Sequence, residues 1–346
     1  MPMDYRRLGL SSLKVSPLCL GTLMFGDLTG DSEAARIVAS AADAGVNFID
    51  TADSYAEGAS ELCVGRLLAG TRRRWMLASK VGNPVGPGPM DGGLSRRWLM
   101  YSIDQSLRRL GTDYLDLWYL HLPDPDTTLV ETLAAVGDVI RSGKVLHWGF
   151  TNYRGWEVAE IIRVADLVGT PRPAVCQAYY NLVNRMPEYD LLPACAHFGI
   201  GIATYSPLAR GVLTGKYLPG RAAPEGTRAD RKEMRIIQVE FREESKRIAQ
   251  DIAAYGAERG LSNIDFAVMW LLNNRLVGSV VTGPRTFEQW ECYLGAMRHR
   301  FTADDEAFAN TLVPPGHSST PGFIDPKFPP TGRVSCARAE SDHSGS

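Results

Sequence analysis

The sequence predicts an α/β protein built around a (β/α)8 barrel. Short apolar runs rich in β-branched and aromatic residues alternate with longer amphipathic runs, and eight strand candidates follow one another in this way. The first seven candidates begin at nearly constant spacing, as expected for a barrel. An open doubly wound sheet is the alternative, but such sheets normally contain fewer strands.

Each strand candidate is a short apolar run. In chain order the candidates are Val15–Gly21, Val46–Thr51, Trp75–Lys80, Tyr114–His121, Val145–Thr151, Ala174–Tyr179, Gly201–Ser206 and Val277–Thr282.

Helical patterns lie between these runs and after the last. They cover Ser32–Ala44, Ser60–Ala69, Ser95–Leu110, Leu129–Ser142, Trp156–Val168, Glu188–His197, Arg242–Arg259 and Thr286–Met297. Asp31 or Ser32 is expected to cap the first helix, and Gly45 follows its end. Ser95 precedes the third helix and Gly111 ends it, again as a capping residue and a terminating glycine.

Three segments add to the repeating pattern. Tyr5–Leu8 and Leu13–Val15 flank a turn and predict an N-terminal hairpin cap. The long interval before the last strand holds a loop rich in Pro, Gly and Arg, Leu218–Glu233, and an extra helical run, Ile264–Asn274. We expect one barrel domain over residues 1–312 and a Pro-rich tail over 313–346. We expect the polar end of the tail, Ala337–Ser346, to be disordered, whereas the Pro-rich part before it could instead fold across the barrel mouth.

Composition excludes several classes of protein. The 37 Lys and Arg residues nearly balance the 39 Asp and Glu residues, leaving a net charge of −2, whereas a nucleic-acid-binding protein usually has a basic excess. The longest apolar run, Phe266–Leu272, is far shorter than the ~18 residues of a membrane helix. No apolar stretch resembling a signal peptide follows the N-terminus. We therefore expect neither a nucleic-acid partner nor a membrane.

The six cysteines are too far apart for a CxxC motif or a zinc site, so no metal is expected. Cys19 and Cys176 lie in apolar runs, where a buried thiol is the ordinary interpretation. A reduced, cytoplasmic protein is expected, and the sequence leaves its oligomeric state open.

Four chemically active side chains fall at or just beyond the carboxyl ends of the second, third and fourth strand candidates: Asp50, Tyr55, Lys80 and His121. In a (β/α)8 barrel, catalytic residues lie at these ends. A lysine ammonium beside a tyrosine lowers the pKa of the phenol and makes it a better acid near neutral pH. Asp50 can keep the lysine charged, and His121 can donate a second hydrogen bond to a substrate oxygen. The set therefore predicts reduction of a carbonyl that is protonated as a hydride arrives at its carbon.

The same segments resemble the aldo-keto reductases. The hairpin, LxLGT, DTADSY, the ASK strand end, LHLPDP, GFTN, the Gln177 strand and YSPLARGVLTGKY occur in the family's order, from about Asp4 to about Met297. The resemblance implies a (β/α)8 barrel that uses NADPH to reduce a small carbonyl compound: an aldehyde, a ketone or a keto-sugar. It also implies that Asp50, Tyr55, Lys80 and His121 form the catalytic tetrad, with Tyr55 as the general acid.

The resemblance further implies a set of cofactor contacts. Thr151, Asn152 and Gln177 match residues that hold the nicotinamide carboxamide, and Tyr205 matches the aromatic residue on which the ring stacks. The other matches run along the pyrophosphate and around the adenosine: Ser206, Leu208, Gly211, Leu213, Lys216, Gly283, Arg285 and Gln289.

The chain departs from the family pattern at a few positions. Thr151 stands where serine is usual, and Thr282 replaces a common proline. Cys292 and Tyr293 stand where Glu-Asn often faces the ribose and adenine. The last departure bears on the adenine contacts and leaves the tetrad untouched.

Two other functions remain open. Some chains that resemble this family serve as regulatory subunits of channels, and Lys80 could instead form a Schiff base in an aldolase. The intact tetrad opposes the first, and Asp50 opposes the second because it favours the ammonium form of the lysine. The physiological substrate cannot be read from the sequence, although Phe25, Trp118, Phe323 and Phe328 are candidates for shaping its pocket.

Overall fold

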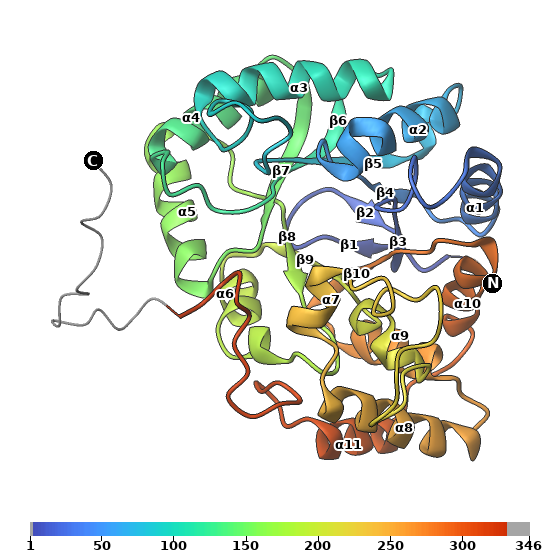
Figure 1. The fold of residues 1–346 in the computed structure, drawn as a ribbon. Coiled ribbons are helices and arrows are strands. Elements are labelled where there is room, and N and C mark those ends of the chain that lie inside the picture. The colour runs from blue at the N-terminus through green and yellow to red at the C-terminus, as the bar shows by residue number, and fades with distance from the viewer. Residues whose placement is uncertain (1–2, 331–346) are drawn as a thin grey trace, which may run out of the picture.

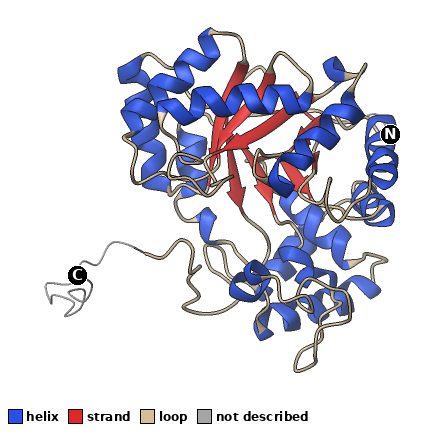
Figure 2. Ribbon diagram, turned by 45° about the horizontal axis from the view of Figure 1, so that its top comes forward, coloured by secondary structure: helices blue, strands red, loops and turns tan. Residues whose placement is uncertain are grey.

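The computed structural model describes residues 3–330. Within that range eight parallel strands close into a barrel in the order β10-β3-β4-β5-β6-β7-β8-β9. Figure 1 shows the chain winding around this barrel, and Figure 2 shows the strands at the centre with helices outside them. The predicted (β/α)8 fold is confirmed.

Every barrel strand overlaps one of the predicted strand candidates. The barrel strands are β3 (Leu18–Gly21), β4 (Phe48–Asp50), β5 (Met76–Val81), β6 (Leu115–Leu120), β7 (Val145–Thr151), β8 (Val175–Tyr179), β9 (Gly201–Tyr205) and β10 (Val277–Thr282). A separate antiparallel pair, β1 (Arg6–Arg7) and β2 (Lys14–Val15), forms the predicted hairpin.

Helices follow the strands in the expected alternation. They are α1 (Asp31–Asp43), α2 (Ala59–Leu68), α3 (Arg96–Leu110), α4 (Leu129–Arg141), α5 (Gly155–Val168), α6 (Leu191–His197), α7 (Met234–Val239), α8 (Glu243–Ala257), α9 (Asn263–Asn273), α10 (Phe287–Ala296) and α11 (Ala303–Leu312). Short 3₁₀ helices lie at η1 (Tyr55–Gly58), η2 (Arg72–Arg74), η3 (Met186–Glu188) and η4 (Ala209–Thr214). Between β9 and β10, α9 packs against β10, whereas α8 packs against α9 and η4. No helix within residues 3–330 is long and apolar enough to cross a membrane.

The start of the first barrel strand differs from the prediction. Val15 pairs with Arg6 in the hairpin, so the candidate Val15–Gly21 is divided, and the barrel strand begins at Leu18. Pro17 separates the two parts because it has no N–H to give to a ladder. Its carbonyl oxygen accepts a hydrogen bond from the Val280 amide at 2.8 Å.

The expected cap of the first helix is wrong, whereas that of the third is confirmed. Helix α1 begins at Asp31 after Gly30, which has no side chain with which to cap it, and the Asp31 carboxylate binds Arg66 instead. Helix α3 has Ser95 as its N-cap and the left-handed Gly111 at its end, as predicted.

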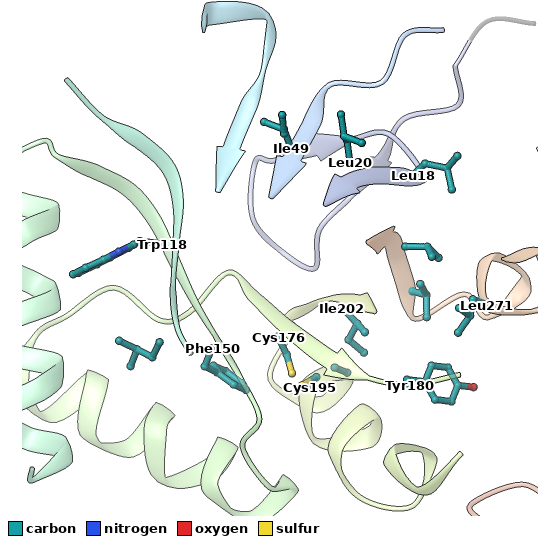
Figure 3. Close-up of a cluster of buried hydrophobic side chains, with 14 of the residues drawn as sticks. Leu18, Leu20, Ile49, Trp118, Phe150, Cys176, Tyr180, Cys195, Ile202 and Leu271 are labelled. Atoms are coloured by element: carbon teal, nitrogen blue, oxygen red, sulfur yellow. The ribbon is translucent and has the colours of Figure 1, made fainter. Parts of the chain in front are cut away.

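Strand alternation divides the core into two layers. Leu18, Leu20, Ile49, Trp118 and Phe150 point outward and pack against the helices (Figure 3). An inner cluster fills the barrel, and its strand residues include Cys19, Phe48, Met76, Ala78, Leu117, Tyr119, Val175, Ala203 and Val281. Because side chains alternate along a strand, residues two or four positions beyond these also face inward at the carboxyl ends.

The hairpin fills the barrel at the amino ends of the strands. Leu8 and Val15 are fully buried in the inner cluster. Gly9 lies against the start of β9 with φ +54°, and a Cβ there would be 2.3 Å from the carbonyl oxygen of Gly199. Glycine is required at this close approach of two backbones.

The Pro-rich tail folds back over the barrel as far as residue 330. The Arg185 amide donates to the carbonyl oxygen of His317 at 2.8 Å, and Arg235 donates to both carboxylate oxygens of Asp325, at 2.9 and 2.7 Å. Lys327 and Phe328 reach the cavity at the carboxyl ends of the strands. The predicted disorder of Ala337–Ser346 lies outside the described residues.

Candidate active site

A cavity of about 500 Å³ opens at the carboxyl ends of the barrel strands. Asp50, Lys80 and Tyr205 share the inward face with the inner cluster, because they lie two or four residues from Phe48, Met76 and Ala203. His121 and Thr151 reach the cavity from the ends of β6 and β7, and Gln177 reaches it from the middle of β8.

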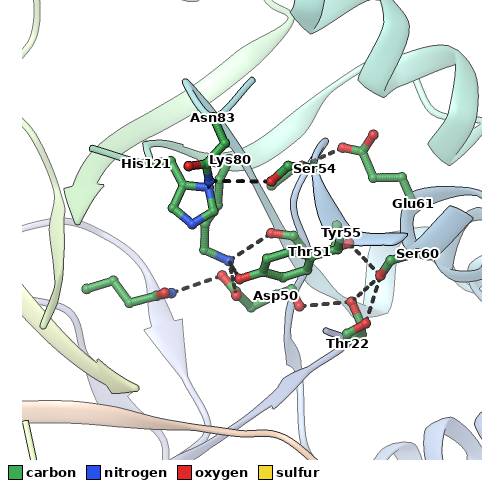
Figure 4. A network of polar contacts seen from close by, with 12 residues as sticks. Thr22, Asp50, Thr51, Ser54, Tyr55, Ser60, Glu61, Lys80, Asn83 and His121 are labelled. Atoms are coloured by element: carbon green, nitrogen blue, oxygen red, sulfur yellow. Dashed lines mark hydrogen bonds and ion pairs between the residues drawn. The ribbon is translucent and has the colours of Figure 1, made fainter. Parts of the chain in front are cut away.

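A buried lysine joins two of the predicted residues. Lys80 Nζ donates to the Asp50 carboxylate, to the carbonyl oxygen of Thr51 at 2.9 Å and to the phenolic oxygen of Tyr55 at 3.1 Å (Figure 4). Gln177 Nε2 donates to the other Asp50 oxygen at 3.0 Å. Burial alone lowers the pKa of Lys80, but Asp50 and Tyr55 outweigh it, and the net pKa lies above the ordinary value. The lysine is therefore a fixed cation.

The expected lowering of the Tyr55 pKa is wrong in its net direction. Burial raises the pKa of Tyr55 above its ordinary value, and the Lys80 charge offsets only part of that rise. The phenol therefore keeps its proton at neutral pH. It is available as a donor, and the ammonium beside it stabilises the phenolate that forms when the proton leaves.

His121 lies beside Tyr55, with ring centroids 6.0 Å apart and planes at 75°. Burial, followed by the charges of Lys80 and Lys327, lowers the pKa of His121 well below its ordinary value, so the imidazole is neutral. Asn83 Nδ2 lies 2.8 Å from His121 Nδ1. Because an amide NH₂ can only donate, Nδ1 accepts and the ring proton is on Nε2. Nε2 of His121 is thus a hydrogen-bond donor.

A network of hydroxyl groups supports the segment that carries Tyr55. Ser60 Oγ lies 2.9 Å from the hydroxyl groups of both Thr22 and Thr51, and it donates to the Thr22 carbonyl oxygen at 2.8 Å (Figure 4). Ala56 and Glu57, directly after Tyr55, have left-handed backbones with φ of 47° and 54°. Such strain in non-glycine residues persists only where the surroundings fix the chain, so the segment next to Tyr55 is held in one conformation.

The residues predicted to hold a nicotinamide line the same cavity as Tyr55 and His121. Thr151 Oγ1 is buried without a hydrogen-bond partner within residues 3–330. Asn152 Nδ2 donates to the carbonyl oxygen of His121 at 2.8 Å, and its Oδ1 accepts from the Tyr205 hydroxyl at 2.7 Å. Gln177 also lines the cavity while it binds Asp50.

The remaining predicted cofactor residues also line the cavity, with one exception. The cavity wall includes Ser206, Leu208, Gly211, Lys216, Gly283, Arg285 and Gln289. Gln289 Oε1 accepts from the Arg285 amide at 2.8 Å. The Leu213 side chain does not reach the cavity, because it is fully buried in the outer layer of the core. Tyr293 lines the wall, whereas Cys292 is exposed elsewhere.

Several residues of the wall were not predicted. Cations from the long loop after β9 and from the tail reach the cavity, namely Arg210, Arg228, Arg231, Arg235 and Lys327. The Arg-rich composition of Leu218–Glu233 was the available signal for two of them. Asn83 was also missed, although it follows Lys80 by three positions in the same strand-end segment.

Only one of the four aromatic pocket candidates lines the cavity. Phe328 forms part of the wall. Phe25 and Trp118 are buried in the outer core layer. Phe323 packs against Arg242, whose guanidinium carbon Cζ is 3.8 Å from the centroid of the phenyl ring.

Comparison with known proteins gives a consistent family assignment. The model of the Aldo/keto reductase family matches residues 17–310. A rice protein named probable voltage-gated potassium channel subunit beta (Oryza sativa subsp. japonica) is 35% identical over 81% of this chain and 87% of its own. L-glyceraldehyde 3-phosphate reductase of Escherichia coli O157:H7 is 32% identical over 88% of this chain and 90% of its own. The uncharacterized oxidoreductase YrpG of Bacillus subtilis (strain 168) is 33% identical over 92% and 98%.

Proposed function

The chain belongs to the aldo/keto reductase family, and on that premise we propose that it reduces a small aldehyde or ketone to an alcohol with NADPH. Tyr55 is the proton donor in this proposal, and His121 is the second hydrogen-bond donor to the carbonyl oxygen. The comparisons support an oxidoreductase of this family. We propose the cofactor, the direction of the reaction and the roles of the residues.

One observation carries the assignment. The Tyr55 phenol and the His121 imidazole line the same cavity, and the phenol is 3.1 Å from the buried Lys80 ammonium, which is paired with Asp50. Two donors on one oxygen polarise a carbonyl and favour attack at its carbon. The Lys80 charge then stabilises the phenolate left behind when the phenol gives up its proton.

The residues divide the proton chemistry among them. Tyr55 transfers its proton to the carbonyl oxygen as charge develops there. His121 donates from Nε2 because Asn83 occupies Nδ1. Asp50 keeps Lys80 charged, and Gln177 binds the second oxygen of the same carboxylate. Only Tyr55 changes its protonation state in the step.

The cavity wall fits a nicotinamide dinucleotide. The unpartnered Thr151 hydroxyl offers a hydrogen bond to a carboxamide, and Tyr205 offers an aromatic face. Lys216, Arg228 and Arg285, which also line the cavity, offer positive charge to the phosphates. NADPH bound there would supply the hydride to the carbonyl carbon, while the Tyr55 proton passes to the oxygen.

The protonated state of Tyr55 suits the role of proton donor in reduction. Alcohol oxidation needs a base at this position, whereas burial raises the pKa of Tyr55 and keeps the phenol protonated at neutral pH.

The proposed compartment is the cytoplasm. Four cysteines carry free thiols that are buried in the core, as in a protein from a reducing compartment: Cys19, Cys63, Cys176 and Cys195.

A regulatory subunit without catalytic activity is the second candidate, because the rice relative is named as a potassium channel subunit. The Schiff-base aldolase is less well supported, since the pKa of Lys80 is raised and an ammonium cannot attack a carbonyl. Mixing the protein with NADPH and a panel of aldehydes, and following cofactor absorbance, separates the reductase from the other two. Steady consumption of NADPH that requires an aldehyde supports the reductase. Cofactor binding without consumption would favour the regulatory subunit.

A further inference from the structure

We propose that the substrate carries a negatively charged group, a phosphate or a carboxylate, and that Arg210 and Lys327 bind this group. The inference rests on the proposed reduction at Tyr55 and names the chemical class of the compound reduced there.

Positive charge dominates the cavity wall. Seven of its residues are Lys or Arg, whereas two, Asp50 and Glu225, are acidic. Asp50 is already paired with Lys80 deep in the barrel. The wall therefore has a large excess of cations, and an anionic ligand is favoured throughout.

These cations form two groups. The first consists of Lys216, Arg228, Arg231 and Arg285. Burial, followed by the charges of the three arginines, lowers the pKa of Lys216, as expected if these residues lie close together. The second lies at the Tyr55 end and consists of Arg210, Arg235 and Lys327. Burial raises the pKa of Tyr55 and the Arg210 charge offsets part of that rise, whereas burial lowers the pKa of His121 and the Lys327 charge adds to that fall. After burial, Arg210 also contributes to the lowered pKa of Arg228, so the two groups adjoin along the wall.

The four cations of the first group are sufficient in number for the phosphates of a bound NADPH. Arg210 lies between Leu208 and Gly211, which are expected along the pyrophosphate, so the test must also separate a cofactor role for it from a substrate role. Within the second group, Asp325 neutralises Arg235 through two hydrogen bonds. This pair also fixes the tail, so that Lys327 and Phe328 line the cavity. Arg210 and Lys327 remain as two positive charges beside the proposed proton donors.

Arg210 has the features of a residue held for a ligand. Its Nε atom is buried without a hydrogen-bond partner within residues 3–330. A buried polar group without a partner costs free energy that an arriving anion recovers. Its backbone is left-handed, with φ 52° and ψ 25°, and Ala209 before it has φ 48°. This strain in two consecutive non-glycine residues is tolerated in a loop that forms part of the cavity wall.

Arg210 also has a possible structural role that the test must separate. Glu240 is fully buried, accepts a hydrogen bond from Tyr179, and has its pKa raised by burial and lowered in part by the Arg210 charge. If Arg210 serves only to balance Glu240, its loss will affect all substrates equally.

The first experiment compares matched aldehydes with the wild-type protein and NADPH. The pairs are glyceraldehyde with glyceraldehyde 3-phosphate, and benzaldehyde with 4-carboxybenzaldehyde. We expect kcat/KM for at least one charged member to exceed that of its neutral partner by about tenfold or more, as for a charged hydrogen bond. The pair that shows the preference identifies phosphate or carboxylate as the anion.

The second experiment uses Arg210→Met and Lys327→Met, with Arg221→Met as a control at an exposed arginine outside the cavity wall. Each test variant should lose about tenfold more kcat/KM for the charged aldehyde than for the neutral one, with an unchanged Kd for NADPH. The control should match wild type.

The outcomes separate this inference from the proposed function. Equal kcat/KM for charged and neutral members, or equal losses for both in the variants, would overturn the anion site and leave the reductase intact. An increase in the Kd for NADPH without a selective loss would assign Arg210 to the cofactor instead. No turnover of any of the four aldehydes would overturn the proposed function and this inference with it.

Discussion

Lys80 Nζ lies 3.1 Å from the phenolic oxygen of Tyr55, and the same ammonium binds the Asp50 carboxylate. Lys80 and Asp50 are almost completely buried, so neither charge can be screened by water. The distance places a permanent positive charge against the one oxygen that is proposed to lose a proton. The proposed stabilisation of the Tyr55 phenolate depends on this contact.

Lys80→Met should lower kcat by about 100-fold or more, because the phenolate formed at Tyr55 loses its stabilising charge. Steady-state kinetics with an aldehyde and NADPH measure the effect. The substitution leaves Asp50 as a buried carboxylate without its partner, so circular dichroism and a Lys80→Met/Asp50→Asn double variant check that the fold is retained.

The same lysine should not react with the substrate. Treating the wild-type protein with borohydride and a carbonyl substrate should leave Lys80 unmodified in a peptide map, since its ammonium is stabilised by Asp50. A reduced adduct at this position would favour the aldolase.

Asn83→Leu should lower kcat by about tenfold, because the donor that assigns the His121 proton to Nε2 is removed. Asn83→Asp should be worse, since a carboxylate favours a proton on Nδ1. The ¹⁵N chemical shifts of the imidazole report the tautomer directly. Unchanged shifts in both variants would show that Asn83 does not position the histidine.

Arg285→Ala should raise the Kd for NADPH by about ten- to a hundredfold and change that for NADH little. A guanidinium at the far end of the cavity can bind the 2′-phosphate that distinguishes the two cofactors. Titration by fluorescence quenching, in wild type and variant, measures both constants. Equal losses for the two cofactors would show that Arg285 supports only the loop, whose Arg285 amide is bound by Gln289.

Asp53 should make the protein less stable as the pH rises. Burial, followed by the charge of Glu61, raises the pKa of Asp53 to about 7, and its Oδ1 has no hydrogen-bond partner within residues 3–330. Between the unfolded pKa of about 3.9 and this value, the folded state binds the extra proton, so stability is lost through that range. Asp53→Asn should therefore raise Tm more at pH 8 than at pH 5. A pH-independent change would contradict the assignment.

Much of the fold and of the proposed tetrad could be predicted because both follow from local patterns. The apolar runs located each barrel strand, and period-two alternation brings Asp50, Lys80 and Gln177 to the inward face. The division at Pro17 was missed because Val15 is apolar in either the hairpin or the barrel. The first helix cap was wrong because Asp31 has a competing partner, Arg66, far along the chain.

Properties that depend on depth or on long-range contacts could not be predicted. The sign of the Tyr55 pKa shift depends on burial, which exceeds the lysine effect, and residue types do not reveal that balance. Lys327 comes from the tail, and its place in the wall depends on the distant contact between Arg235 and Asp325. Leu213 belongs to a recognised motif, but the fold turns its side chain into the core.

The most direct test is Tyr55→Phe, which removes the phenolic proton and little else. NADPH consumption with an excess of aldehyde is compared with wild type, and the Kd for NADPH is measured on the same samples. We predict a Kd close to that of wild type and a kcat lowered by about 100-fold or more, because the proton donor of the reduction is lost. Without its general acid the enzyme should keep about a hundredth of the wild-type kcat or less. A variant that keeps more than about a tenth of it would show that Tyr55 does not protonate the carbonyl oxygen.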